Sequence, residues 1–154
     1  PVHVYQLSAA GLALFPDRYA DTVVHLLDQL VALQGREASV ATLQRHFGRL
    51  GAQVCAEAAA LPPASRGEYI ARALDTEGFM ATWRSDGDGG LLVEHNCPHR
   101  LVAERFPEVC AAEEAFLSEA FGVAVQRQSR IADGCGTCSY HVARDGGVQS
   151  EGTP

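Results

Sequence analysis

The chain has 154 residues, of which 47% are hydrophobic and 20% charged, a composition typical of a globular protein with one buried core. It contains no apolar run near the roughly 18–20 residues of a membrane span and no secretory signal pattern, so we expect a soluble, cytoplasmic protein with reduced cysteines. Twelve arginines, no lysine and nineteen acidic residues leave a net charge of -7. This balance excludes nucleic-acid binding that is driven by the overall charge of the chain.

The N-terminal part is predicted to be mostly helical. Residues 1–7 alternate as a short strand, and residues 16–34 have the apolar period of a helix that ends near Gly35. A stripe this wide either packs on its own domain or pairs with a second copy of the chain, and the pattern leaves both open. The stripe consists of Val23, Leu26, Leu27, Leu30 and Leu33, widened by Val24 and Val31.

Two further helices are expected before the first strand. One covers residues 38–60, with an interruption near Gly48 and Gly51, and ends at Pro62 and Pro63. The other runs from residue 65 to 76.

After residue 78 the period changes from helical to alternating. Residues 79–86 and 91–96 form a β-hairpin, whose turn Asp86, Asp88, Gly89 lacks the later oxygen ligands of a calcium loop. Two helical pieces follow, separated at Phe106–Pro107, and then a second strand pair around the turn at residues 133–137. The expected fold is α+β: N-terminal helices followed by a small antiparallel sheet of two hairpins with helices packed on it.

Four of the five cysteines lie between residues 97 and 138. On one unbroken helix Cys97 and Cys110 would stand about 20 Å apart, at about 1.5 Å per residue, and could not share a cofactor. Pro107 predicts a break, which places Cys97 at a helix N-cap and Cys110 in a first turn. Unpaired N–H groups and partial positive charge there favour thiolates.

Cys135 and Cys138 form a CxxC motif in a hairpin. A dithiol oxidoreductase places this motif at the start of a helix, and a disulfide so short would be strained, so we expect a shared metal or cluster. The C-x12-C spacing is unusual for zinc and thiolates also suit iron-sulfur clusters, so both stay open. His95 and His99 are possible substitute ligands, although a surface histidine is the commoner case. Cys55 has the apolar setting of a packing residue.

Three stretches resemble the SufR-type iron-sulfur regulators, a branch of the bacterial winged-helix repressors related to the ArsR and DeoR groups. PVHVYQLSAAGLALFP, at residues 1–16, resembles the second wing strand and exit of the winged-helix domain. Residues 94–127, with a cysteine before Pro98 and another thirteen positions on, resemble the cluster-binding segment. DGCGTCSYHV, at residues 133–142, resembles the closing hairpin.

The resemblance implies a homodimeric sensor that carries an iron-sulfur cluster, of the 4Fe-4S type, and represses genes for cluster assembly. Alternatives are 2Fe-2S and zinc. It implies Cys97, Cys110 and Cys138 as ligands; Cys135 departs from the family pattern and is either the fourth ligand or leaves that place to His99 or another group. DNA would be bound through a winged-helix domain mostly absent from this chain.

The resemblance also divides the chain into segments. Residues 1–15 are the remnant of the wing strand and exit, 16–62 a helical dimerisation region, 63–144 an α+β cluster-binding sensor domain, and 145–154 a flexible tail.

Two other functions fit the same sequence. One is a zinc-stabilised dimerisation module, and the other is a V4R-like small-molecule-binding regulatory domain with a cavity beneath Trp83 and Phe79. We expect no enzyme, because the sequence has no nucleophile-base pair, phosphate loop or convergent carboxylate motif.

Overall fold

The computed structural model of the chain describes residues 19–86 and 89–143. The expected wing remnant, the start of the first helix, the tip of the first hairpin and the tail lie outside these residues. The elements in chain order are α2 (Tyr19–Gln34), α3 (Arg36–Ala59), α4 (Pro63–Thr76), β1 (Ala81–Asp86), β2 (Gly89–Glu94), α5 (Arg100–Arg105), α6 (Glu108–Phe121), β3 (Val125–Ser129), the short 3-10 helix η1 (Ile131–Asp133) and β4 (Cys138–Val142). The α+β fold class is therefore confirmed.

The strands within the described residues form one four-stranded antiparallel sheet in the order β1-β2-β4-β3. The two expected hairpins are thus joined through the pairing of β2 with β4. The register sets two neighbouring rows of side chains on the inner face of the sheet. One row is Trp83, Leu92, Tyr140 and Arg127, and the other is Ala81, Glu94 and Cys138.

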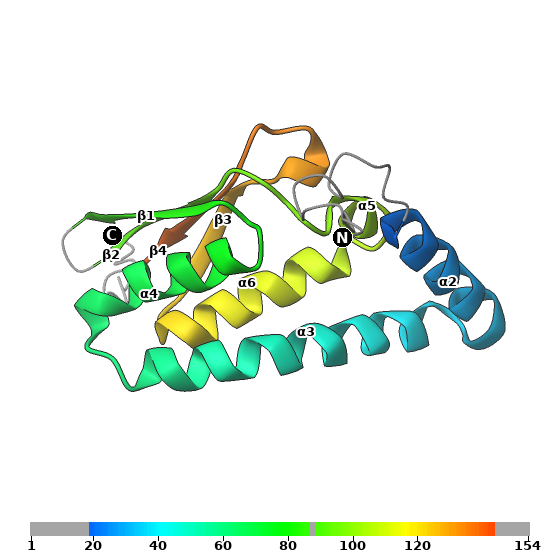
Figure 1. Cartoon of the computed structure of the whole chain (residues 1–154), viewed down its shortest axis with the longest axis horizontal. Coiled ribbons are helices and arrows are strands. Elements are labelled where there is room, and N and C mark those ends of the chain that lie inside the picture. The colour runs from blue at the N-terminus through cyan, green and yellow to red at the C-terminus, as the bar shows by residue number, and fades with distance from the viewer. Residues whose placement is uncertain (1–18, 87–88, 144–154) are drawn as a thin grey trace, which may run out of the picture.

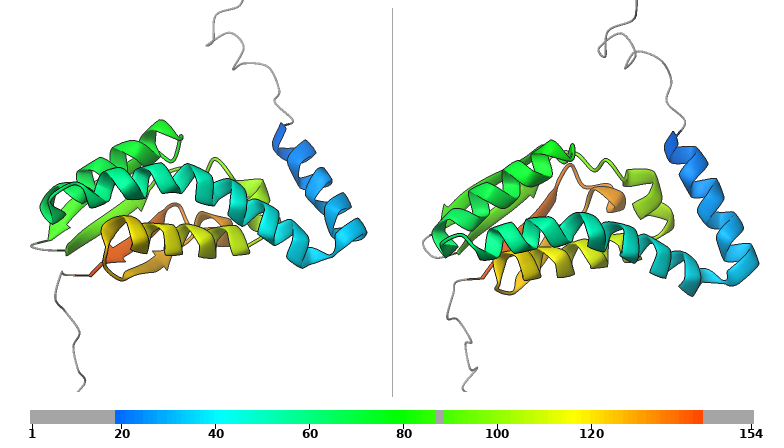
Figure 2. Two further views of the ribbon diagram at one scale, coloured as in Figure 1. Left: turned by 90° about the horizontal axis from the view of Figure 1, so that it is seen from below. Right: turned by 60° about the horizontal axis from the view of Figure 1, so that its bottom comes forward.

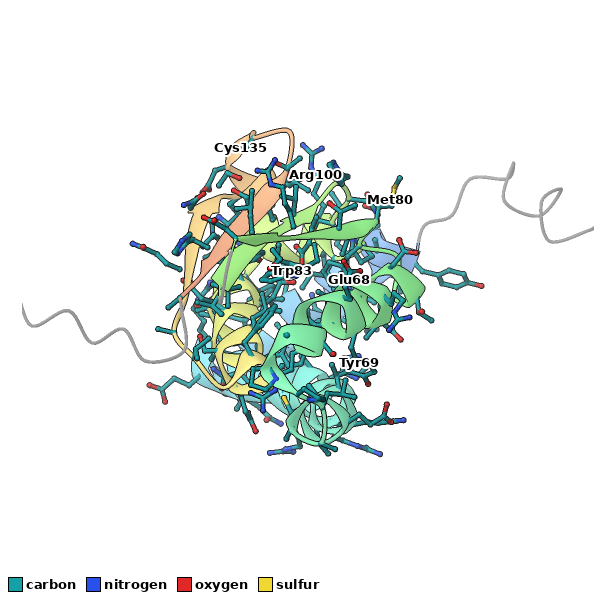
Figure 3. The ribbon with its side chains drawn as sticks, turned by 90° about the vertical axis from the view of Figure 1, so that its left-hand side faces the viewer. Glu68, Tyr69, Met80, Trp83, Arg100 and Cys135 are labelled. Carbon is teal, nitrogen blue, oxygen red and sulfur yellow. The ribbon has the colours of Figure 1, made fainter. Side chains whose placement is uncertain are left out.

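The sheet, the helices α4 and α6, and the long helix α3 form three successive layers (Figure 1). The core between the sheet and its helices includes the fully buried Ile70, Leu92, Leu117 and Tyr140. Trp83 points from β1 toward α4, as Figure 3 shows, and its ring packs on Phe121 with centroids 5.2 Å apart. The opposite face carries exposed polar side chains such as Arg84, Gln126 and His141, as expected for an antiparallel sheet with one covered side.

Helix α2 stands at an angle to α3 at one end of the molecule (Figure 2). A second, smaller core joins it to α3, α5 and α6. The buried members of this core are Leu27, Leu43, Val102, Phe106 and Val109, with Val24, Val31 and Phe47 packed against them.

Two sequence predictions about helices have opposite outcomes. The expected break at Phe106–Pro107 is confirmed, because α5 ends at Arg105 and α6 begins at Glu108. The expected interruption near Gly48 and Gly51 is wrong, since α3 runs through both glycines. At Gly51 a Cβ atom would stand 2.7 Å from the Phe116 ring, so the glycine serves close packing of α3 on α6.

None of the helices in the described residues combines the length and the hydropathy that a membrane crossing requires.

Candidate functional site

Three chain segments meet at the end of the sheet where β2 finishes (Figure 1). Cys97 lies in the link between β2 and α5, Cys110 is the third residue of α6, and Cys138 is the first residue of β4. Cys110 and Cys138 are buried, and Cys97 is half-buried. The proline break turns α6 back along the sheet, so that these three cysteines approach one another.

The three thiols are electrostatic neighbours. Burial, with smaller contributions from Glu113, Cys138 and Cys110, raises the pKa of Cys97 to about 12. Burial likewise raises the pKa of Cys138 to about 11, with further contributions from Glu94, Glu113 and Cys110. The structure thus brings together cysteines that are up to 41 positions apart in the chain.

The expectation of thiolates at helix N-termini is wrong. The pKa of Cys110 is also raised, because burial outweighs the favourable position in the first turn of α6. The N-cap of α5 is His99 rather than Cys97, which lies two residues earlier. These thiols are therefore neutral unless a cation lies among them.

Each sulfur nevertheless has a hydrogen-bond donor close to it. The Ile131 amide donates to Cys138 Sγ at 3.3 Å. The His99 backbone N–H lowers the pKa of Cys97, and the Arg130 side chain lowers that of Cys110, each against the stronger effect of burial. Such donors stabilise anionic sulfur, the form that binds metals.

A carboxylate lies fully buried beside the thiols. Glu94, the last residue of β2, is 0% exposed, and neither of its carboxylate oxygens has a hydrogen-bond partner. It pairs across the sheet with Cys138, and the Cys138 thiol, as a weak hydrogen-bond donor, lowers the pKa of Glu94, although the two form no hydrogen bond of normal geometry. Burial, and then the nearby Glu113, raise the pKa of Glu94 far above its ordinary range.

A second polar group borders the site, and its members are partnered except at Arg127 Nε, which is buried without a hydrogen-bond partner. Tyr140 Oη donates to Glu113 at 2.6 Å, and the Arg127 guanidinium lies over the Tyr140 ring with its carbon 5.2 Å from the centroid. Arg127 also donates to the carbonyl of Cys110 and lies 3.4 Å from a Glu114 oxygen. These contacts fix the first turn of α6 against β3 and β4.

The sequence prediction missed these polar residues, although a signal for each existed. Glu94 follows Leu92 by two positions and therefore shares its buried face of the strand. Glu113 follows Cys110 by three positions and shares its side of α6. A carboxylate on a buried face is the kind of exception that indicates a site.

The remaining candidates lie outside this group. Cys135 is exposed on the loop before β4 (Figure 3) and does not act on the pKa of Cys97, Cys110 or Cys138. The ring of His99 packs between Phe47 and Phe79, with centroids 4.8 and 5.7 Å away. His95 is exposed. Cys55 packs against the main core, as the sequence predicted.

Across residues 19–86 and 89–143, no three His, Cys, Asp or Glu side chains are arranged to hold a metal ion. The thiols are neighbours without forming a preformed single-ion site.

A cavity of about 440 Å³ opens beside the site between α3, α4 and α6. Its walls are mostly apolar and include Phe47, Val54, Phe79 and Phe116, with Glu113 on the side toward the thiols. The sequence placed a cavity beneath Phe79 and Trp83. Phe79 does line this one, whereas Trp83 does not.

No known protein family and no curated protein matches the chain significantly.

Proposed function

We propose that this chain is the sensing and dimerisation part of an iron-sulfur-dependent transcription regulator of the SufR type. The observation that supports this best is the meeting of Cys97, Cys110 and Cys138, from three segments, beside a buried carboxylate without partners. Cys55 and Cys135 lie outside that group.

The residues present fit a cluster of the 4Fe-4S type. Two buried thiols and one half-buried thiol supply soft ligands, and nearby N–H donors supply the hydrogen bonds that stabilise ligated sulfur. Around one zinc ion the Zn–S bonds are about 2.3 Å long, so the sulfurs of a tetrahedral site stand only about 3.8 Å apart. A centre of several metal atoms takes more widely spaced ligands.

Such a cluster supplies a centre whose redox state and integrity respond to oxidants and to iron supply. The protein's own contribution is the geometry of α5, which has Cys97 three residues before its start and Cys110 five residues after its end. Phe106 and Val102 connect this short helix to α2 through the smaller core. Ligation at both ends of α5 therefore restrains the surface on which α2 packs, and α2 is the first helix of the described residues after the expected wing remnant at residues 1–15.

The test is anaerobic reconstitution of the chain with iron and sulfide, followed by metal and sulfide counts and an absorption spectrum. Cys97→Ser, Cys110→Ser and Cys138→Ser should each lose most of the bound iron and sulfide. Cys55→Ser and Cys135→Ser are the matched controls and should retain them. Equal iron content in all five variants, or no iron in the unmodified chain, would contradict the proposal.

Repression belongs to the same proposal and needs the complete regulator. There, Cys110→Ser should abolish the dependence of DNA affinity on the cluster. Unchanged affinity with and without the cluster would remove the sensing role.

The zinc-stabilised module remains the first alternative. It predicts a colourless protein that holds zinc and no sulfide after anaerobic purification. The same metal analysis therefore separates it from the main proposal.

A second candidate function is supported by the cavity between α3, α4 and α6. Its volume of about 440 Å³ and apolar walls are those of a small-molecule site, as in a V4R-like regulatory domain. Ala112→Trp, on the cavity wall, should then weaken binding of an apolar fluorescent probe such as ANS without changing iron content. Probe binding equal to that of the unmodified chain would exclude an accessible apolar site.

A further inference from the structure

We infer that Glu94 is the fourth protein ligand of the proposed cluster, so that the site is built from three cysteines and one carboxylate. This inference rests on the proposed function, and it names the ligand that the sequence left open. Its basis is the position and isolation of the Glu94 carboxylate.

The register of the sheet directs Glu94 toward the thiols. Glu94 and Cys138 are direct partners across the antiparallel pair of β2 and β4, so their side chains leave the sheet on the same face. Leu92 and Tyr140, the next partners on that face, are fully buried in the core. The carboxylate therefore stands beside Cys138, on the side of the sheet that α6 covers.

The carboxylate lacks the partners that a structural role requires. A buried carboxyl group normally accepts hydrogen bonds or pairs with a cation, because burial without either is costly. Glu94 is 0% exposed and neither oxygen is hydrogen-bonded. Arg127, the cation that acts on the pKa of Glu94, contacts Glu114 and the Cys110 carbonyl through its Nη atoms, and its buried Nε makes no hydrogen bond to Glu94. A metal centre held by the thiols would give the Glu94 carboxyl the cationic partner that it lacks and would stabilise its charged form.

The other candidates fit the fourth position less well. Glu113 is engaged by Tyr140 at 2.6 Å, His99 is packed between two phenylalanine rings, and Cys135 is exposed on its loop. In the described residues, Glu94 and Glu113 are the carboxylates that act on the pKa of these thiols. Of the two, Glu94 is the one whose oxygens accept no hydrogen bond of normal geometry.

The experiment compares the unmodified chain with Glu94→Gln, Glu94→Leu and Glu94→Cys after anaerobic reconstitution with ⁵⁷Fe and sulfide. Glu113→Gln tests the rival carboxylate, and Glu104→Gln, an exposed residue of α5, is the control. In the unmodified chain the Mössbauer spectrum should contain one iron site distinct from the rest, and in Glu94→Cys this difference should disappear. Glu94→Gln and Glu94→Leu should release iron to a chelator about ten- to a hundredfold faster, while Glu113→Gln and Glu104→Gln keep the distinct site.

Unfolding of the metal-free proteins distinguishes a ligand from a structural group. Removing a buried carboxyl without partners should raise the unfolding midpoint of metal-free Glu94→Leu by roughly 2–4 °C, while its iron retention falls. A lower midpoint together with faster iron release would make Glu94 structural and overturn the inference. Unchanged spectra and release rates in the Glu94 variants would also overturn the inference. Loss of the distinct iron site in Glu113→Gln alone would overturn it as well. In both cases the proposed function stands. An unmodified chain that takes up no iron and sulfide would overturn the proposed function, and the inference with it.

Discussion

At the scale of single residues, the contact of Trp83 with two glycines decides how closely α4 approaches the sheet. A Cβ atom on Gly67 of α4 would stand 2.1 Å from the indole ring, and one on Gly90 of β2 would stand 2.5 Å from it. Because the ring also packs on Phe121, it has little freedom to move aside. The glycines therefore create the space that the tryptophan fills.

Gly67→Ala should destabilise the protein by about 1–3 kcal/mol, because the added methyl group overlaps the indole ring. Gly48→Ala is the matched control: it lies in the interior of α3, and a Cβ there meets nothing within 4 Å. Replacing this exposed helix glycine should stabilise the protein by about 0.5–1 kcal/mol. Chemical denaturation measures both, and a Gly67→Ala protein as stable as the unmodified chain would disprove the packing argument.

Single residues also show how much of the candidate site could be predicted from the sequence. The approach of Cys97 to Cys110 could be predicted from the proline break, because one backbone rule determines where a helix must stop, whereas the choice of Cys138 over Cys135 came from the family resemblance. The pKa values of the thiols could not be predicted, because they depend on burial, which only the packing of α5, α6 and β4 sets. Glu94 was missed for a related reason: the alternation of β2 places it inward, but only the register with β4 places it beside Cys138.

At the scale of elements, the break between α5 and α6 is stabilised by α3. Arg36, the first residue of α3, donates from Nε and Nη2 to the two oxygens of Glu108, the first residue of α6, at 2.8 and 2.9 Å. The same guanidinium lies over the ring of Phe106, with its carbon 5.1 Å from the centroid. The start of α3 thus holds the turn that brings Cys110 back toward Cys97.

Glu108→Gln should lower the unfolding midpoint at neutral pH by a small amount, since the ion pair is partly exposed. The hydrogen bond from Arg36 lowers the pKa of Glu108 below its usual value of about 4.3. The pair therefore stabilises the fold above that usual value, and its contribution is lost as the pH falls through the lower folded pKa. Thermal unfolding from pH 7 to pH 3 should show the difference from the unmodified chain shrinking in acid.

Glu104→Gln serves as the control for this pair. Its ion pair with Arg100 lies within α5 and joins no two elements. A pH-independent effect of Glu108→Gln, or one no larger than that of Glu104→Gln, would contradict the proposed role of the Arg36 pair.

The elements also show which sequence rules predicted the fold correctly and which did not. Periodicity predicted α2, α4 and both strand pairs, because each of them has one apolar side facing a core. The glycines of α3 misled the prediction, since a glycine is read as a helix breaker unless the neighbouring helix is known. Here Phe116 of α6 occupies the space at Gly51, and the long helix continues.

At the scale of the whole molecule, α2 has two apolar sides with different surroundings. Leu27, Val24 and Val31 face the smaller core. Tyr19, Leu26 and Leu33 are 80%, 64% and 81% exposed, and Val23 is 43% exposed. The single wide stripe seen in the sequence is therefore divided between intramolecular packing and an exposed seam.

The spacing of that seam supports a second copy of the chain as its partner. Residues 19, 23, 26, 30 and 33 follow the alternating steps of four and three that place the a and d positions of a coiled coil on one side. An exposed apolar seam of this kind on a helix favours pairing with an equivalent helix. Through Phe106 and Val102, the opposite side of α2 contacts the segment between two of the proposed ligands, so pairing of α2 helices would connect the sites of two protomers.

Leu26→Glu and Leu33→Glu should each weaken self-association by roughly thirtyfold or more, the effect of about 2 kcal/mol at a central interface position. Both side chains are exposed within one chain, so the substitutions should leave its fold intact. Met80→Glu, which replaces a 58% exposed residue before β1, is the matched control and should have no effect on association. Sedimentation equilibrium over a range of concentrations measures the dissociation constant, and circular dichroism checks the fold. An unmodified chain that sediments as a monomer at every concentration, or a Met80→Glu variant as weakened as the leucine variants, would show that α2 does not pair through this seam.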